Sequence, residues 1–122
     1  MAVPILKQGD VLIASIQVAL SDDDLALLRD QLAERVGRLR SRGVIIDVTA
    51  LDVLDSFATR TLRSIAYTAK LRGASTIVVG IQPEVAFAMV QLGLSLEGIS
   101  TALDLEEGLD FILRGSGLAL GN

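Results

Sequence analysis

The sequence contains no cysteine, no histidine and no tryptophan, and aromatic residues fill only 3% of its 122 positions. The absence of cysteine excludes disulfides, thiolate metal sites and cysteine nucleophiles, and it favours a cytoplasmic location. The absence of histidine removes the usual general base near neutral pH, the commonest metal ligand and every Ser-His-Asp triad. We therefore interpret the chain as a protein that is not an enzyme, and we expect neither a metal nor a cofactor.

Long apolar runs and basic stripes are also missing. No stretch reaches the about 18 uninterrupted apolar residues of a membrane span, and the first residues lack the pattern of a signal peptide. The net charge is -4 and basic residues are mixed with acidic ones, so we expect neither a membrane nor a nucleic-acid partner. The hydrophobic residues, 51% of the chain, are mainly aliphatic and suffice for the core of one domain.

The first half of the chain predicts a hairpin, a helix and a central strand. Two short apolar runs, 3–6 and 11–17, are separated by residues 7–10, whose Gly and Asp suit a tight reversal. Ser21 begins a helix with Asp24 three residues later, a capping arrangement, and Gly43 is the expected stop. The apolar run 44–48 then predicts a buried strand.

The second half predicts alternating helices and strands. A helix from Ser56 ends near Gly73, a strand covers 76–80, and Pro83 begins a third helix that runs to Leu92. A short strand follows at 99–103, and Asp104 with Glu107 caps a fourth helix. The predicted inward residues of the helix after Ser56 are Ala58, Leu62, Ile65, Ala66 and Ala69. The order predicts an α/β domain over residues 1–115, with an N-terminal antiparallel hairpin, a mostly parallel sheet and a loose tail at 116–122.

The segment from the central strand to the second helix, 47–57, is the candidate functional region. In open parallel sheets, sites form beyond the carboxyl ends of the strands. Ser56 falls there, and its simplest interpretation is an N-cap of the helix. Asp52 or Asp55 is an alternative cap, and Asp47 is suited to accept hydrogen bonds from loop amides.

Ser56 has a second interpretation as a phosphoacceptor. Free backbone amides and the positive end of the dipole at a helix N-terminus can hold an added dianion without unfolding the helix. A partner surface built around Leu54, Ser56 and Phe57 would then gain negative charge beside Asp52 and Asp55. Docking would have to desolvate that charge, so binding should fall.

The Asp55-Ser56 pair at the start of a helix resembles the hallmark of STAS domains, named for sulfate transporters and anti-sigma-factor antagonists. Within that family the chain is most similar to RsbS-type stressosome antagonists, over nearly its whole length. The segments that carry this resemblance are Pro4-Ile5-Leu6-Lys7, Ser15-Ile16-Gln17, Gly43-Val44-Ile45-Ile46-Asp47, Asp55-Ser56-Phe57, Gly80-Ile81-Gln82-Pro83, Leu92-Gly93 and Thr101-Ala102-Leu103-Asp104-Leu105-Glu106.

The resemblance implies the STAS fold and a phosphorylation-switched scaffold. Such a protein co-assembles with RsbR-like co-antagonists, as a dimer and as part of a large complex. It sequesters an RsbT-like serine kinase until that kinase phosphorylates Ser56, and a separate serine phosphatase resets the site. The serine acceptor and the start directly at the first strand favour the antagonist over the RsbR-like sensor.

Three other interpretations stay open. A simple anti-anti-sigma factor would use the same serine to bind an anti-sigma kinase without a large assembly. A magnesium or aspartyl-phosphate site would use Asp47, Asp52 and Asp55, although the second acidic cluster it needs is better used by the first helix. Nucleotide binding lacks a Gly-rich phosphate loop. The face formed by Thr59, Arg60, Thr61 and Arg63 belongs either to an interface or to solvent.

Overall fold

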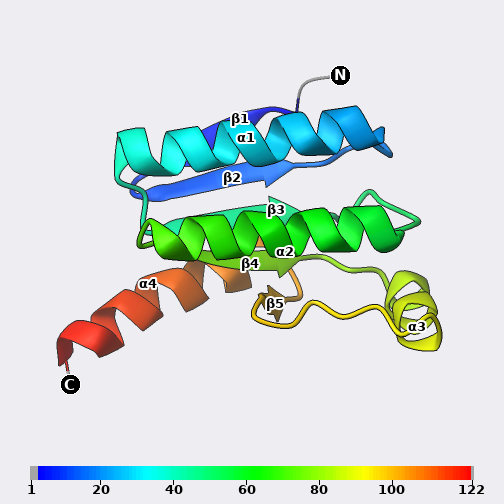
Figure 1. The fold of residues 1–122 in the computed structure, drawn as a ribbon. Helices are drawn as coiled ribbons and strands as arrows, with labels where there is room; N and C mark the ends of the chain where they lie inside the picture. The colour runs from blue at the N-terminus through cyan, green and yellow to red at the C-terminus, as the bar shows by residue number, and fades with distance from the viewer. Residues whose placement is uncertain (1–2, 122) are drawn as a thin grey trace.

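The computed structural model describes residues 3–121, and for 116–121 it describes the backbone alone. Within these residues the chain forms a five-stranded sheet with helices on both faces (Figure 1). No helix among them combines the length and hydropathy needed to cross a bilayer. The elements, in chain order, are β1 (Ile5–Gln8), β2 (Val11–Ser15), α1 (Asp22–Leu39), β3 (Gly43–Asp47), α2 (Ser56–Leu71), β4 (Ser75–Val79), α3 (Pro83–Gln91), β5 (Ser100–Ala102) and α4 (Leu105–Gly121).

The sheet has the strand order β1-β2-β3-β4-β5, with β1 antiparallel to β2 and every later neighbour parallel. This confirms the predicted fold class. The hairpin is displaced from its expected position, because β1 includes Lys7 and Gln8 and the reversal occurs at Gly9, whose φ of 59° suits glycine. The carboxyl ends of β2 to β5 meet at one edge of the sheet.

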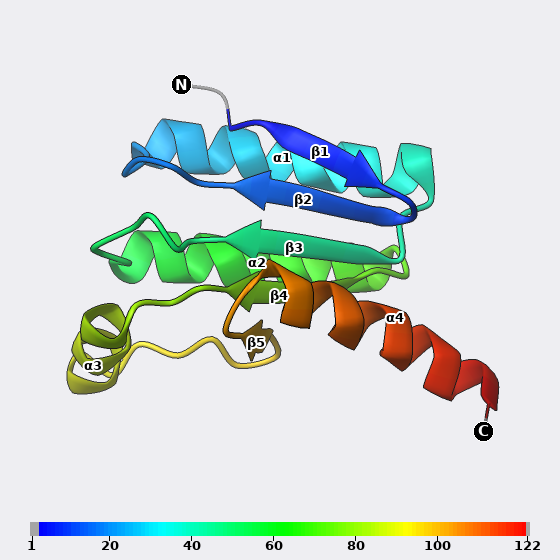
Figure 2. The same cartoon turned by 180° about the vertical axis from the view of Figure 1, so that it is seen from behind.

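Alternation along the strands divides the core into two layers. Leu12 and Ala14 of β2 pack with α1 and α2 on one face, whereas Val11 and Ile13 pack on the other. That second face is covered by α4, which lies over β3, β4 and β5 (Figure 2). The central strand β3 is buried on both faces, as its continuous apolar run predicts.

The first helix ends earlier than predicted. It stops at Leu39, and Arg40 adopts the left-handed conformation with φ 51°. Gly43, the expected stop, instead begins β3, where an added Cβ would lie 2.6 Å from the Ile112 side chain of α4. Glycine at this position therefore serves helix-to-sheet packing instead of helix termination.

The caps at the other helix ends follow the sequence more closely. The Asp24 amide donates to Ser21 Oγ at 3.1 Å, and the Glu107 amide donates to Asp104 Oδ1 at 2.9 Å. The last helix runs to Gly121, so the backbone is helical in most of the segment expected to be a loose tail. Residue 122 lies outside the described residues, and the domain limit at 115 stays a prediction.

Candidate functional site

The carboxyl edge of the sheet is held in shape by polar contacts from the β3–α2 loop. Asp47, the last residue of β3, accepts hydrogen bonds at Oδ1 from the Thr49 amide (2.9 Å) and the Thr49 hydroxyl (2.6 Å). Gln82 Nε2 donates to the Thr49 carbonyl at 2.7 Å, which ties this loop to the start of α3. Gly80, with φ 81°, leaves room for Thr49, because a Cβ at Gly80 would collide with the Thr49 side chain.

The start of α2 is capped by Asp55. Asp55 has extended backbone angles, and its Oδ1 accepts the Ala58 amide at 2.8 Å. The N-cap interpretation of Ser56 is therefore wrong, because the neighbouring carboxylate takes that position and Ser56 becomes the first helical residue. The alternative that Asp55 caps the helix is confirmed, and so is the role of Asp47 toward loop amides.

This arrangement leaves the Ser56 hydroxyl free for chemistry. Ser56 is exposed, and as the first two helical residues Ser56 and Phe57 have backbone amides without intrahelical acceptors. The first turn of α2 contains no acidic residue, so the positive end of its dipole is offset only by the Asp55 cap. The position can carry an exposed anion without loss of a structural hydrogen bond.

The apolar part of the site differs from the prediction in one residue. Leu54 is only 5% exposed and packs in the core, so it supports the loop and is not itself available to a partner. Val53, which the sequence interpretation did not single out, is 67% exposed beside it, and Phe57 is half-buried. The exposed surface around Ser56 is therefore formed by Asp52, Val53 and Asp55, with Phe57 at its margin.

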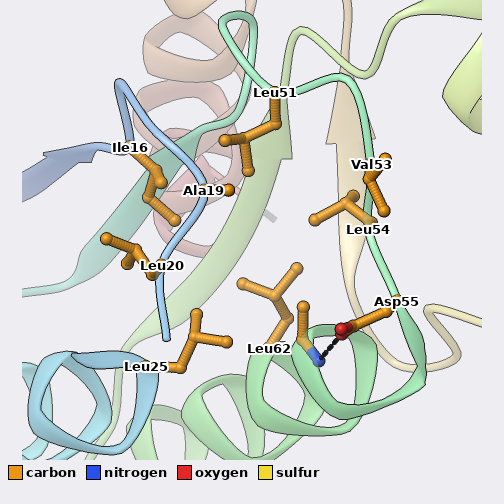
Figure 3. A pocket seen from close by; sticks show the side chains of 10 residues that line it. Ile16, Ala19, Leu20, Leu25, Leu51, Val53, Leu54, Asp55 and Leu62 are labelled. Carbon is orange, nitrogen blue, oxygen red and sulfur yellow. Dashed lines mark hydrogen bonds between the residues drawn. The ribbon is translucent and has the colours of Figure 1, made fainter. Parts of the chain in front are cut away.

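Behind this surface lies a small apolar pocket of about 80 Å³ between the β2–α1 and β3–α2 loops (Figure 3). Leu51, Leu54 and Leu62 point into it, as do Leu20 and Leu25, which flank the start of α1. A pocket of this size is far below the roughly 300–1,000 Å³ of small-molecule sites. The geometry favours recognition of a surface over binding of a small molecule at this end.

The acidic side chains of the loop do not form a metal site. Asp47 is engaged by Thr49 and Asp55 by the Ala58 amide, while Asp52 is exposed. Within residues 3–121, no three acidic side chains come together in a way that would hold a metal ion. The magnesium interpretation therefore has no geometric support.

The hydroxyl-rich face of α2 was predicted to be an interface or solvated, and for two residues both options are wrong. Thr59 and Thr61 are 1% and 4% exposed, and their hydroxyls donate to the carbonyls of Asp55 and Phe57. Because this hydrogen bond to the preceding turn satisfies the hydroxyl, a threonine can be buried in the helix. A hydroxyl in the sequence therefore does not indicate an exposed position. Arg60 is exposed, and Arg63 Nη1 donates to the Ser95 carbonyl at 3.2 Å.

The fold and site together define a class: a small α/β domain whose exposed serine begins the helix after the central strand. The description of the STAS domain family matches residues 2–108, and the chain belongs to that family. Among solved structures it resembles a variant of RsbS from Moorella thermoacetica in which glutamate replaces a serine. The identity is 36% and the TM-score 0.81, with 93% of this chain and 97% of that one covered.

Two further similarities agree with this assignment. A chain from a structure titled as the molecular architecture of the stressosome, a signal integration and transduction hub, is 36% identical with a TM-score of 0.78, over 93% of this chain and 98% of that one. The RsbT co-antagonist protein RsbRA of Bacillus subtilis is 30% identical over 71% of this chain. The match spans only 32% of RsbRA, so the chain corresponds to about a third of that curated relative.

Proposed function

We propose that this chain is a stressosome antagonist that co-assembles with RsbR-like STAS proteins and holds an RsbT-like serine kinase until Ser56 is phosphorylated. The observation that carries the proposal is the exposed Ser56 at the first position of α2, beside a cap that does not need its hydroxyl. The similarity to RsbS and to a stressosome chain supports the choice of partners. The chain acts by binding and is not itself an enzyme.

In this proposal a phosphate on Ser56 is favourable for helix α2 but unfavourable for the docked partner. A phosphate on Ser56 would lie at the positive end of α2, where free amides favour it, so the domain stays folded. The same phosphate adds almost two negative charges to a surface that already contains Asp52 and Asp55. A partner that covers Val53 and Ser56 must desolvate these charges, so the kinase is released.

The test is phosphorylation and capture with a cognate RsbT-like kinase. Intact mass after incubation with kinase and ATP should rise by one phosphate, mapped to Ser56, and Ser56→Ala should stay unmodified while it still binds the kinase. Ser75→Ala is the matched control, because Ser75 is also exposed but lies at the amino end of β4. Labelling of Ser56→Ala to the level of wild type would refute the assignment.

Assembly is tested separately by light scattering of the chain mixed with an RsbR-like protein. A particle far larger than either component is expected from the similarity to the stressosome chain. If the mixture stays at the mass of small oligomers while the kinase is still captured, the simpler anti-anti-sigma system replaces the stressosome assignment.

A further inference from the structure

The end of the sheet opposite Ser56 has an open depression of about 560 Å³. It lies where α1 and α2 end, at the amino ends of the strands, on the left in Figure 1. Three arginines line it, Arg40, Arg42 and Arg72, together with Ser41. The arginines lie up to 32 positions apart in the sequence and are brought together by the two helix ends.

The charges of these arginines are only weakly compensated. Arg42 Nε lies 3.7 Å from Asp10 Oδ2, an ion pair too long for a hydrogen bond. Within residues 3–121, Arg40 and Arg72 have no carboxylate partner. The C-termini of α1 and α2 contribute about half a negative charge each. Three guanidinium charges therefore exceed the opposing charge of Asp10 and the helix ends.

Two of the residues that line the depression each have a buried side-chain atom without a hydrogen-bond partner within the described chain. Ser41 is only 4% exposed, and its Oγ has no partner within the described chain. The Nε of the next residue, Arg42, is likewise buried without an acceptor. Buried polar groups are almost always satisfied, and a group that accepts hydrogen bonds would satisfy both atoms, because the Arg42 Nε–H and the Ser41 hydroxyl can each donate.

The backbone supports the same conclusion. Arg40 is the single non-glycine residue with positive φ among residues 3–121, although glycine is favoured at such a helix end. This residue with left-handed backbone angles is one of those that line the depression. Gly37 leaves the space that the Arg72 guanidinium occupies, because a Cβ there would lie 2.6 Å from Arg72 Nε and collide with the rest of the group.

We propose that this depression, the arginine pocket formed by Arg40, Ser41, Arg42 and Arg72, binds a phosphate group. A phosphate dianion accepts several charge-assisted hydrogen bonds at once and matches the planar fork of a guanidinium, while the Ser41 hydroxyl donates one more. The depression is also wide enough for an ester substituent. The pocket shares no residue with the Ser56 surface, which lies at the opposite end of the sheet.

The experiment is calorimetric titration of the full chain with inorganic phosphate, at constant ionic strength set with chloride. Wild type should bind in the millimolar range or tighter, and Arg72→Gln and Ser41→Ala should each weaken binding about tenfold. Arg40→Gly should weaken it similarly while it raises Tm, since glycine relieves the positive φ. Arg114→Gln is the control, because Arg114 is exposed and paired with Asp110, and it should bind as wild type.

Amide chemical shifts locate the anion. Phosphate should shift the amides of Gly37 and Gly73, which line the pocket, and leave Gly80 and Ser56 unchanged. Shifts at Ser56 and Phe57 instead would place the anion at the N-terminus of α2 and overturn the proposal. Equal affinity of wild type and Arg40→Gly would overturn it as well.

The source of the phosphate is resolved by competition with inorganic phosphate. Ribose 5-phosphate represents a free ester, and a peptide of residues 52–60 phosphorylated at Ser56 represents a protein-borne one. Displacement by either supports the site and assigns its source. If neither competes, the pocket does not accept a phosphate ester and the proposal fails.

Discussion

The two ends of the sheet differ in charge and in how their polar groups are used. At the carboxyl end, Asp47 and Asp55 accept hydrogen bonds from the loop and the helix start, so their carboxylates are part of the structure. At the amino end, Arg40 and Arg72 have no carboxylate partner within residues 3–121, and Ser41 Oγ is unsatisfied. The polar groups of the carboxyl end hold the loops in the shape that a partner would contact, whereas those of the amino end remain available to bind a ligand.

Two glycines allow the rigidity of these ends to be compared directly. Gly80 and Gly73 both have positive φ, but a Cβ at Gly80 would strike Thr49, whereas a Cβ at Gly73 meets nothing within 4 Å. Gly80→Ala should lower the free energy of unfolding by about 2–4 kcal/mol, since strain and a clash add. Gly73→Ala should lower it by about 1 kcal/mol from strain alone. Urea unfolding measures both, and equal losses would show that the carboxyl end is no more tightly constrained.

The charge at Ser56 gives the second comparison. Ser56→Asp should weaken kinase binding about 100-fold, or ~2.7 kcal/mol, because the new carboxylate joins Asp52 and Asp55 on the docking surface. The fold should be retained, since an acidic residue in the first turn is favourable toward the helix dipole. Surface plasmon resonance with immobilised kinase measures the loss. Ser75→Asp carries the same charge change at the amino end and should bind as wild type.

Much of this contrast could be read from the sequence at the carboxyl end and almost none at the amino end. The order of the elements, the inward stripe of α2 and the site beyond β3 follow from patterns within short windows, which local periodicity and capping residues report. Arg40 and Arg72 are far apart in the chain, and their proximity depends on how α1 and α2 pack against each other. Likewise, Val53 and Leu54 are adjacent apolar residues of one loop, and only packing decides that Leu54 is the buried one.

Removal of the α2 cap should have a smaller effect, and it tests whether Ser56 depends on its neighbour Asp55. Asp55→Ala removes the acceptor of the Ala58 amide and should cost about 1 kcal/mol of unfolding free energy. Asp55→Asn keeps an acceptor and should cost only a few tenths of a kcal/mol. Thermal unfolding of the two variants gives the difference. If Ser56 takes over as the cap, Asp55→Ala loses nothing, and phosphate on Ser56 would then disturb the helix start.

The last comparison concerns a gain in stability at the amino end. Arg40→Gly should raise the free energy of unfolding by about 1 kcal/mol, because glycine adopts the left-handed conformation that an arginine side chain disfavours. Arg40→Asn, which tolerates that conformation, should give part of the gain, and Arg38→Gly, inside α1, should instead lose about 1 kcal/mol. Urea unfolding in chloride and in phosphate separates the two roles of Arg40. A gain that shrinks when phosphate is present would show that this strained arginine is retained for a ligand, whereas the same gain in both buffers would leave the residue without that role.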